Sequence, residues 1–138
     1  MERTEQEKII VIPCSGIGKA FGSIAREATY ELTENLRSKT TGTVCLALLV
    51  SGDEESLNLV RENKCITVDG CPLQCAEKNV RLAGGNFAGS FRVVDAFKEN
   101  RHLKPKSVTF LDDDGQRLAK VLAEKMASKV DELLGGES

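Results

Sequence analysis

The stretch DGCPLQCAEK, residues 69–78, carries two cysteines separated by three residues, with a proline directly after the first. Thiols this close can form a disulfide, bind a metal ion or react as nucleophiles. Because proline favours the first position of a helix, we predict that a helix begins at Pro72, with Cys71 at its N-cap and Cys75 one turn further on. Residues four apart on a helix share a face, so both sulfur atoms can converge on one point. The C-x₃-C spacing falls within the range that structural zinc sites use.

Short apolar runs alternate with helical patterns along the chain. We predict strands over Lys8–Pro13, Thr43–Val50, Cys65–Val68 and Phe91–Phe97. Ser107–Leu111 is either a short fifth strand or a loop. We predict helices over Ile17–Leu36, Glu54–Asn63, Pro72–Leu82, ended by Gly84–Gly85, and Gln116–Leu134, capped by Asp112–Asp114. This alternation is typical of a parallel sheet that is covered on both faces by helices. We therefore expect one α/β domain over residues 1–138. It should be a three-layer sandwich with a mainly parallel sheet of four or five strands, Rossmann-like or flavodoxin-like.

The predicted sheet brings further cysteines toward the C-x₃-C pair. Ligand sites in such sheets gather beyond the carboxyl ends of the strands. Cys14 follows the first predicted strand directly and Cys71 follows the third, so we expect both at that edge together with Cys75. The first of these, Cys14, is the natural third ligand of a tetrahedral site.

The two other cysteines are harder to place at that edge. Cys45 is the fourth candidate ligand, because the second strand should lie beside the first or the third. It reaches the edge if its strand is shorter than it looks, or if residues 46–50, LALLV, are partly loop or helix. Cys65 begins the third predicted strand, at the opposite end of the sheet, and at about 3.3 Å per residue it lies too far from Cys71. We interpret Cys65 as a small buried hydrophobic residue.

Three sequence segments at these strand ends resemble one known family. CSG follows the first strand, CLA lies near the second, and DGCPLQCA follows the third. Together they are similar to the DGC-domain family of small proteins, to which zinc binding is ascribed, and the similarity extends from about Lys8 to the terminal helix. The family's four characteristic cysteines correspond by position to Cys14, Cys45, Cys71 and Cys75. The family's usual Cys-Leu-Ala-Gly reads Cys-Leu-Ala-Leu here. The resemblance implies metal binding and assigns no particular activity.

Zinc is the metal that four cysteine thiolates suit best, and an iron–sulfur cluster is the alternative. Four protein ligands close the zinc coordination sphere, so a structural, sensing or metal-carrying role is expected rather than water activation. A thiol-redox or cysteine-dependent enzyme, with Cys71 as nucleophile and Cys75 as resolving thiol, stays open as a second hypothesis. It lacks an obvious base, since the only histidine, His102, lies in a basic stretch that we interpret as a surface loop.

Composition and charge exclude several other classes of function. Net charge is −2 and tryptophan is absent, which disfavours nucleic-acid binding, and no run of about 18 apolar residues predicts a membrane span. The start of the chain shows no signal peptide, so we expect a cytoplasmic protein with reduced thiols. The segment GIGKAFG, residues 16–22, lacks the third glycine of a dinucleotide fingerprint and the lysine–serine or lysine–threonine end of a phosphate-binding loop. A metal ion is the partner that these patterns predict, with room for an unidentified protein partner.

Overall fold

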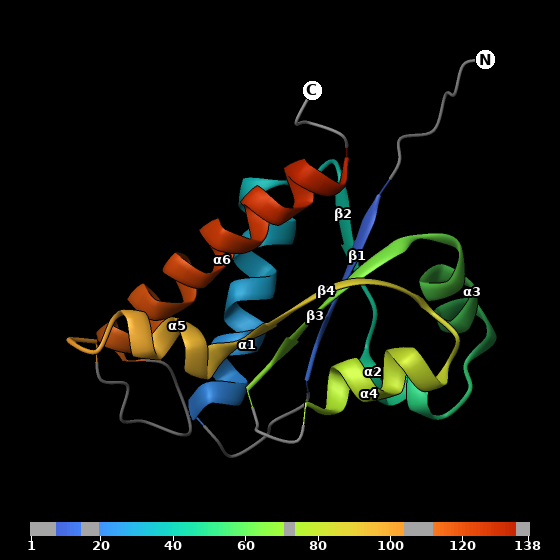
Figure 1. Ribbon diagram of the computed structural model, residues 1–138, viewed down its shortest axis with the longest axis horizontal. Helices are drawn as coiled ribbons and strands as arrows, with labels where there is room; N and C mark the ends of the chain where they lie inside the picture. The colour runs from blue at the N-terminus through green and yellow to red at the C-terminus, as the bar shows by residue number, and fades with distance from the viewer. Residues whose placement is uncertain (1–7, 15–19, 71–73, 104–111, 135–138) are drawn as a thin grey trace.

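The computed structural model describes residues 8–14, 20–70, 74–103 and 112–134. Within these ranges a four-stranded sheet has the order β2-β1-β3-β4, and each neighbouring pair of strands is parallel. The strands are β1 (Ile9–Pro13), β2 (Thr41–Thr43), β3 (Lys64–Asp69) and β4 (Asn86–Arg92). Figure 1 shows their carboxyl ends pointing toward the lower part of the view.

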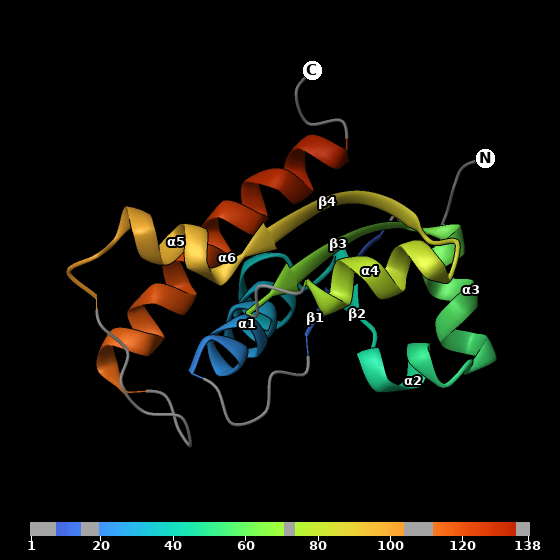
Figure 2. The same ribbon diagram turned by 60° about the horizontal axis from the view of Figure 1, so that its bottom comes forward.

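Helices cover both faces of this sheet (Figures 1 and 2). One face carries α1 (Ala20–Glu31), the π-helical turn η1 (Leu32–Leu36), α5 (Val93–Glu99) and α6 (Asp113–Leu133). The other face carries α2 (Leu46–Val50), α3 (Glu54–Glu62) and α4 (Cys75–Leu82). This arrangement confirms the expected three-layer α/β sandwich, and its strand order matches the start of the flavodoxin-like order. No helix in the described ranges is both long and apolar enough to cross a membrane.

The hydrophobic core lies on both sides of β1 and β3. Residues 9–12 are fully or almost fully buried, as the apolar run in the sequence predicts for a central parallel strand. The long helix α6 adds a buried stripe at helical spacing that includes Leu118, Leu122, Met126 and Val130. Its N-terminus is capped as expected, because a carboxylate oxygen of Asp112 accepts a hydrogen bond from the Gly115 amide at 2.9 Å.

The second predicted strand, Thr43–Val50, is wrong. The strand β2 is Thr41–Thr43, and the apolar run that follows Cys45 forms the helix α2. Within that helix Leu46 and Leu49 are buried, and the residues between and after them are exposed. Burial three residues apart is helical, so the run packs one side on the core instead of both sides.

Two further boundaries differ from the predictions. The fourth strand spans Asn86–Arg92, not Phe91–Phe97, and Val93–Glu99 is the helix α5. The helix α4 ends at Leu82 as predicted but begins at Cys75, so Pro72 is not its first residue. The predicted strand Ser107–Leu111 lies outside the described residues.

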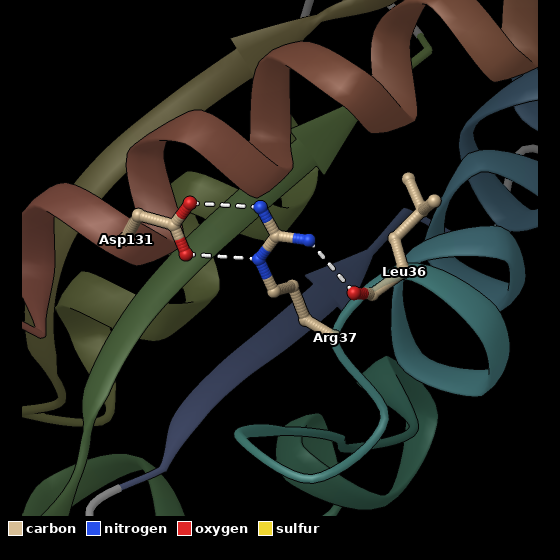
Figure 3. Close-up of polar contacts among 3 residues, drawn as sticks. All are labelled: Leu36, Arg37 and Asp131. Carbon is tan, nitrogen blue, oxygen red and sulfur yellow. Dashed lines mark hydrogen bonds and ion pairs between the residues drawn. The ribbon is translucent and has the colours of Figure 1, made fainter.

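Polar contacts close the amino edge of the sheet. Arg37, just before β2, donates from Nε and Nη2 to the two carboxylate oxygens of Asp131 on α6, at 2.8 and 2.7 Å (Figure 3). Its Nη1 donates to the Leu36 carbonyl at 2.8 Å. Beside this pair, Lys64 at the start of β3 donates to the Leu133 carbonyl at 2.9 Å. These contacts attach the end of α6 to the start of β3 and to the segment just before β2. Cys14 and Cys45 lie at the opposite, carboxyl edge of the sheet.

Candidate metal centre

The carboxyl edge of the sheet has a point where the chain diverges. After β1 it passes to α1 on one face, and after β3 it passes to α4 on the other, although these two strands are neighbours. Crevices of this kind, at the switch between the two directions of a parallel sheet, are where open α/β folds bind ligands. Cys14 directly follows β1, and residue 71 comes two positions after the end of β3.

Cys14 is fastened to the end of β3 by two hydrogen bonds. Its amide donates to the Val68 carbonyl at 2.9 Å, which extends the sheet pairing past the end of β1. Its sulfur, in a side chain only 2% exposed, accepts a hydrogen bond from the Gly70 amide at 3.0 Å. A backbone N–H directed at sulfur favours a thiolate, because the donor stabilises negative charge. Cys14 therefore lies beside the residue that immediately precedes Cys71.

Cys45 also reaches the carboxyl edge, because β2 is short. It lies two residues beyond the end of β2 in extended conformation and directly precedes α2, with its side chain exposed. Cys14 and Cys45 both line one pocket of about 210 Å³. The structure therefore brings these two cysteines to neighbouring positions on one side of the crevice, one buried and the other open to solvent.

Cys75 is the first residue of α4 and is partly buried against the core. The helix is held there by Asp69, the last residue of β3, whose side chain is 1% exposed. One carboxylate oxygen accepts from the Ala76 amide at 2.8 Å and the other from the Glu77 amide at 3.2 Å. These are two of the amides that a helix start leaves without intrahelical partners, so Asp69 caps α4 from the neighbouring strand.

Burial is the main influence on Asp69 and raises the pKa of its carboxyl. The hydrogen bonds from Ala76 and Glu77 lower that pKa, and the nearby charge of Glu77 raises it. The predicted helix start at Pro72 was wrong, because α4 begins at Cys75 and its first free amides are satisfied by Asp69. The residue before α4, Gln74, has a left-handed backbone with φ 53°, which turns the chain into the helix.

The two remaining cysteines are Cys71 and Cys65. Cys71 lies outside the described residues. Cys65 is fully buried near the amino end of β3, where its thiol donates to the carbonyls of Val60 at 3.2 Å and Asn63 at 3.3 Å. The pKa of Cys65 is raised to about 11, because burial raises it by more than an amide hydrogen bond from Asn86 lowers it. These surroundings fit its interpretation as a buried core thiol.

The described residues alone do not complete a metal site. Among residues 8–14, 20–70, 74–103 and 112–134, no three histidine, cysteine, aspartate or glutamate side chains gather closely enough to hold a metal ion. The chemistry of the donors fits zinc, since thiols follow neighbouring strands at one edge and a backbone amide points at one sulfur. Cys14, Cys45 and Cys75 do not form a three-ligand group in this structure, and the fourth predicted ligand, Cys71, lies outside the described residues.

Sequence reasoning missed the pocket wall that α1 supplies. Arg26 and Tyr30 line the same pocket as Cys14 and Cys45. They are four residues apart on α1 and therefore share a face of the helix. Their spacing is visible in the sequence, but their packing against the segment that contains residue 45 is not.

Comparison with known proteins identifies the family of this chain. The sequence model of the DGC domain matches residues 10–129, a range that includes Cys14, Cys45, Cys71 and Cys75. The chain therefore belongs to the DGC-domain family. Neither the curated proteins nor the solved structures give a significant match.

Proposed function

We propose that this member of the DGC-domain family binds zinc through the thiolates of Cys14, Cys45, Cys71 and Cys75. The observation that supports this most is the hydrogen bond from the Gly70 amide to the Cys14 sulfur at 3.0 Å. It joins the ends of β1 and β3 at the switch point and directs a donor at sulfur, as amides around metal-bound thiolates do. The next residue along the chain after this donor is itself a cysteine.

The remaining ligands follow from the elements around this contact. Cys75 begins a helix whose start is fixed to β3 by Asp69, and Cys45 shares a pocket with Cys14. Bound zinc would supply a cross-link between the ends of three neighbouring strands and α4. Four thiolates give the site a formal charge of −2, which backbone donors such as the Gly70 amide offset in part.

A site closed by four protein ligands has no open position for water. The role we propose is therefore structural, sensing or metal-carrying rather than hydrolytic. Thiolates in this state persist where thiols are kept reduced, so the proposal includes a reducing compartment such as the cytoplasm.

Thiol protection provides the test, because Cys45 is exposed and would otherwise react quickly. Protein purified without oxygen is treated with an alkylating reagent, with and without a strong chelator, and each cysteine is followed by peptide mass spectrometry. Zinc binding predicts that Cys45 is protected until chelator is added and that one zinc per chain is released. Cys65 serves as the internal control, since burial should protect it in both samples.

Other outcomes would identify the competing hypotheses. Immediate alkylation of Cys45 in zinc-replete protein would contradict the proposal. A visible absorption band together with iron in the metal analysis would point to an iron–sulfur cluster. A Cys71–Cys75 disulfide that forms reversibly, without metal, would favour thiol-redox chemistry.

A further inference from the structure

A pocket of about 320 Å³ lies between α2, α3 and α4, the three helices on one face of the sheet (Figure 2). Arg61 on α3 donates from Nε to the carbonyl of Ala83, just after α4, at 2.8 Å, so α3 is attached to the end of α4 beside the pocket. The walls are therefore in place before any partner binds. Asn79 and Arg61 add polar groups to five apolar lining residues, namely Leu49, Val50, Leu57, Leu82 and Ala83.

Large apolar side chains are exposed around this pocket. Leu82 is 84% exposed and Val50 is 60% exposed, and both line it. Leu48, on the same short helix as Val50, is 49% exposed. Among the described residues, these are three of the four large hydrophobic side chains that are exposed. One exposed leucine is ordinary, but apolar side chains that gather around one pocket mark a contact surface.

Two opposite charges flank this surface on different helices. Lys78 lies one helical turn before Leu82 on α4, and Glu54 lies one turn before Leu57 on α3. Each therefore shares a helix face with a residue that lines the pocket. Both side chains are exposed, and neither has an ion-pair partner in the part of the chain that the structure describes. The surface thus has an unpaired cation on one side and an unpaired anion on the other.

We propose that this surface binds a second copy of the chain about a two-fold axis, with Leu82 of each copy over the pocket of the other. In a two-fold contact each pair of residues occurs twice, once in each direction. Lys78 of one copy then pairs with Glu54 of the other, and the reverse pair forms as well. Opposite charges on one surface satisfy each other in this way, whereas a nucleic acid or an anionic membrane would require an excess of cations.

This inference is independent of the proposed zinc site, because none of the described residues that line the pocket is a cysteine. Analytical ultracentrifugation of the full-length protein, over a range of concentrations, tests it directly. Reductant is present throughout, so that no disulfide through the exposed Cys45 links two chains. We expect a reversible dimer and no larger species, because a closed two-fold contact leaves no site for a third copy. A monomer at every concentration, or growth beyond the dimer, would overturn the proposal.

Leu82 provides the first variant. Leu82→Asp should weaken the dimer roughly tenfold or more, because it places a charge in the centre of the apolar contact. Leu82→Met, which keeps the side chain apolar and of similar volume, should retain the dimer. Since Leu82 is exposed in the single chain, neither change should alter folding, which thermal unfolding checks. Equal dimerisation of the wild type and Leu82→Asp would contradict the proposed contact.

An exchange of charges tests the two-fold arrangement. Lys78→Glu and Glu54→Lys should each weaken the dimer roughly threefold to tenfold, since each brings like charges together twice. The double variant should recover most of the loss, because each pair is restored with its signs exchanged. Lys120→Glu is the matched control, because it reverses an exposed charge on α6, which covers the other face of the sheet. A double variant as weak as the two losses combined, or an equal loss in Lys120→Glu, would overturn the pairing.

Discussion

Cys14 directly follows β1 and Cys65 lies near the amino end of β3, and both side chains are buried, but their sulfur atoms make different hydrogen bonds. At the carboxyl edge, Cys14 accepts a hydrogen bond from the Gly70 amide. At the amino edge, Cys65 donates to two carbonyl oxygens, and burial raises its pKa to about 11. An amide donor favours the thiolate, whereas carbonyl acceptors require the proton to stay on sulfur. Burial alone therefore does not distinguish the proposed zinc ligand Cys14 from the core thiol Cys65, whose pKa is raised to about 11.

The two edges of the sheet differ in the same sense. The amino edge is closed by contacts that need no further component, such as the bidentate pair of Arg37 and Asp131. The carboxyl edge holds thiols, a carboxylate that caps α4, and a pocket. One edge is closed by ion pairs and hydrogen bonds, and the other holds the thiols that we propose to bind zinc. Substitutions at the two edges should therefore separate stability from zinc affinity.

The largest expected difference is between Cys14→Ser and Cys65→Ala. Cys14→Ser removes a proposed ligand, so it should lower zinc affinity on the order of 100-fold or more. Changing a group that only hydrogen-bonds to a ligand usually has a smaller effect. Cys65→Ala should leave zinc affinity unchanged and cost about 1–2 kcal/mol of unfolding free energy through a small cavity. Chelator competition measures the first quantity and urea unfolding the second. Equal zinc affinity in the two variants would contradict the comparison.

Two aspartates that cap helices give the next largest contrast. Asp69→Ala leaves the buried amides of α4 without an acceptor, so we expect a loss of about 2–3 kcal/mol in stability and roughly tenfold in zinc affinity. Asp53→Ala removes the cap of α3, where Asp53 accepts from the Ser56 amide at 3.0 Å. It should cost about 1 kcal/mol and leave zinc affinity unchanged. The same chelator and urea measurements apply, and a fall in zinc affinity for Asp53→Ala would show that the effect is not local.

A pH effect on stability should arise from Cys65. Its pKa rises from an ordinary 9.0 to about 11 on folding, so the unfolded chain loses the thiol proton first as pH increases. This contribution to stability is complete below pH 9 and is lost between pH 9 and about 11, on the order of 2–3 kcal/mol. Unfolding curves of the wild type and Cys65→Ala, taken under reducing conditions, should diverge across that window. Parallel curves would mean that the thiol is not held protonated.

The smallest effect is expected for the ion pair at the amino edge. Hydrogen bonding to Arg37 lowers the pKa of Asp131 below its usual 3.8, so the stabilisation is present above that pH and lost as pH falls below it. Both side chains are substantially solvent-exposed, so Asp131→Asn should cost under about 1 kcal/mol at neutral pH, and less at high salt. Zinc affinity should not change. A loss that persists at pH 2 would show that the pair contributes through packing instead of charge.

The parts of the fold that the sequence predicted are those with a strong pattern and a local boundary. The strand β1 is a continuous apolar run, and α6 has an apolar stripe with Asp112 directly before it. The run after Cys45 was misassigned because five apolar residues fit a buried strand as well as a helix. Only the tertiary packing of Leu46 and Leu49, with Leu48 exposed, decides between them.

The candidate site was predictable to the level of the sheet edge. Cys14 and Cys45 lie at the same edge of the sheet because each follows the end of a parallel strand. The Gly70 contact and the cap of α4 by Asp69 depend on how the turn after β3 folds back, which no periodicity encodes. The pocket wall at Arg26 depends on packing between α1 and the segment after β2, so it too needed coordinates.

X-ray absorption at the zinc edge, on protein purified without oxygen, tests most directly whether the chain delivers its thiolates to one ion. We predict one zinc per chain with four sulfur neighbours at about 2.3 Å. A zinc shell with nitrogen or oxygen in place of any of these sulfur atoms, or protein that retains no zinc, would contradict the four-cysteine centre.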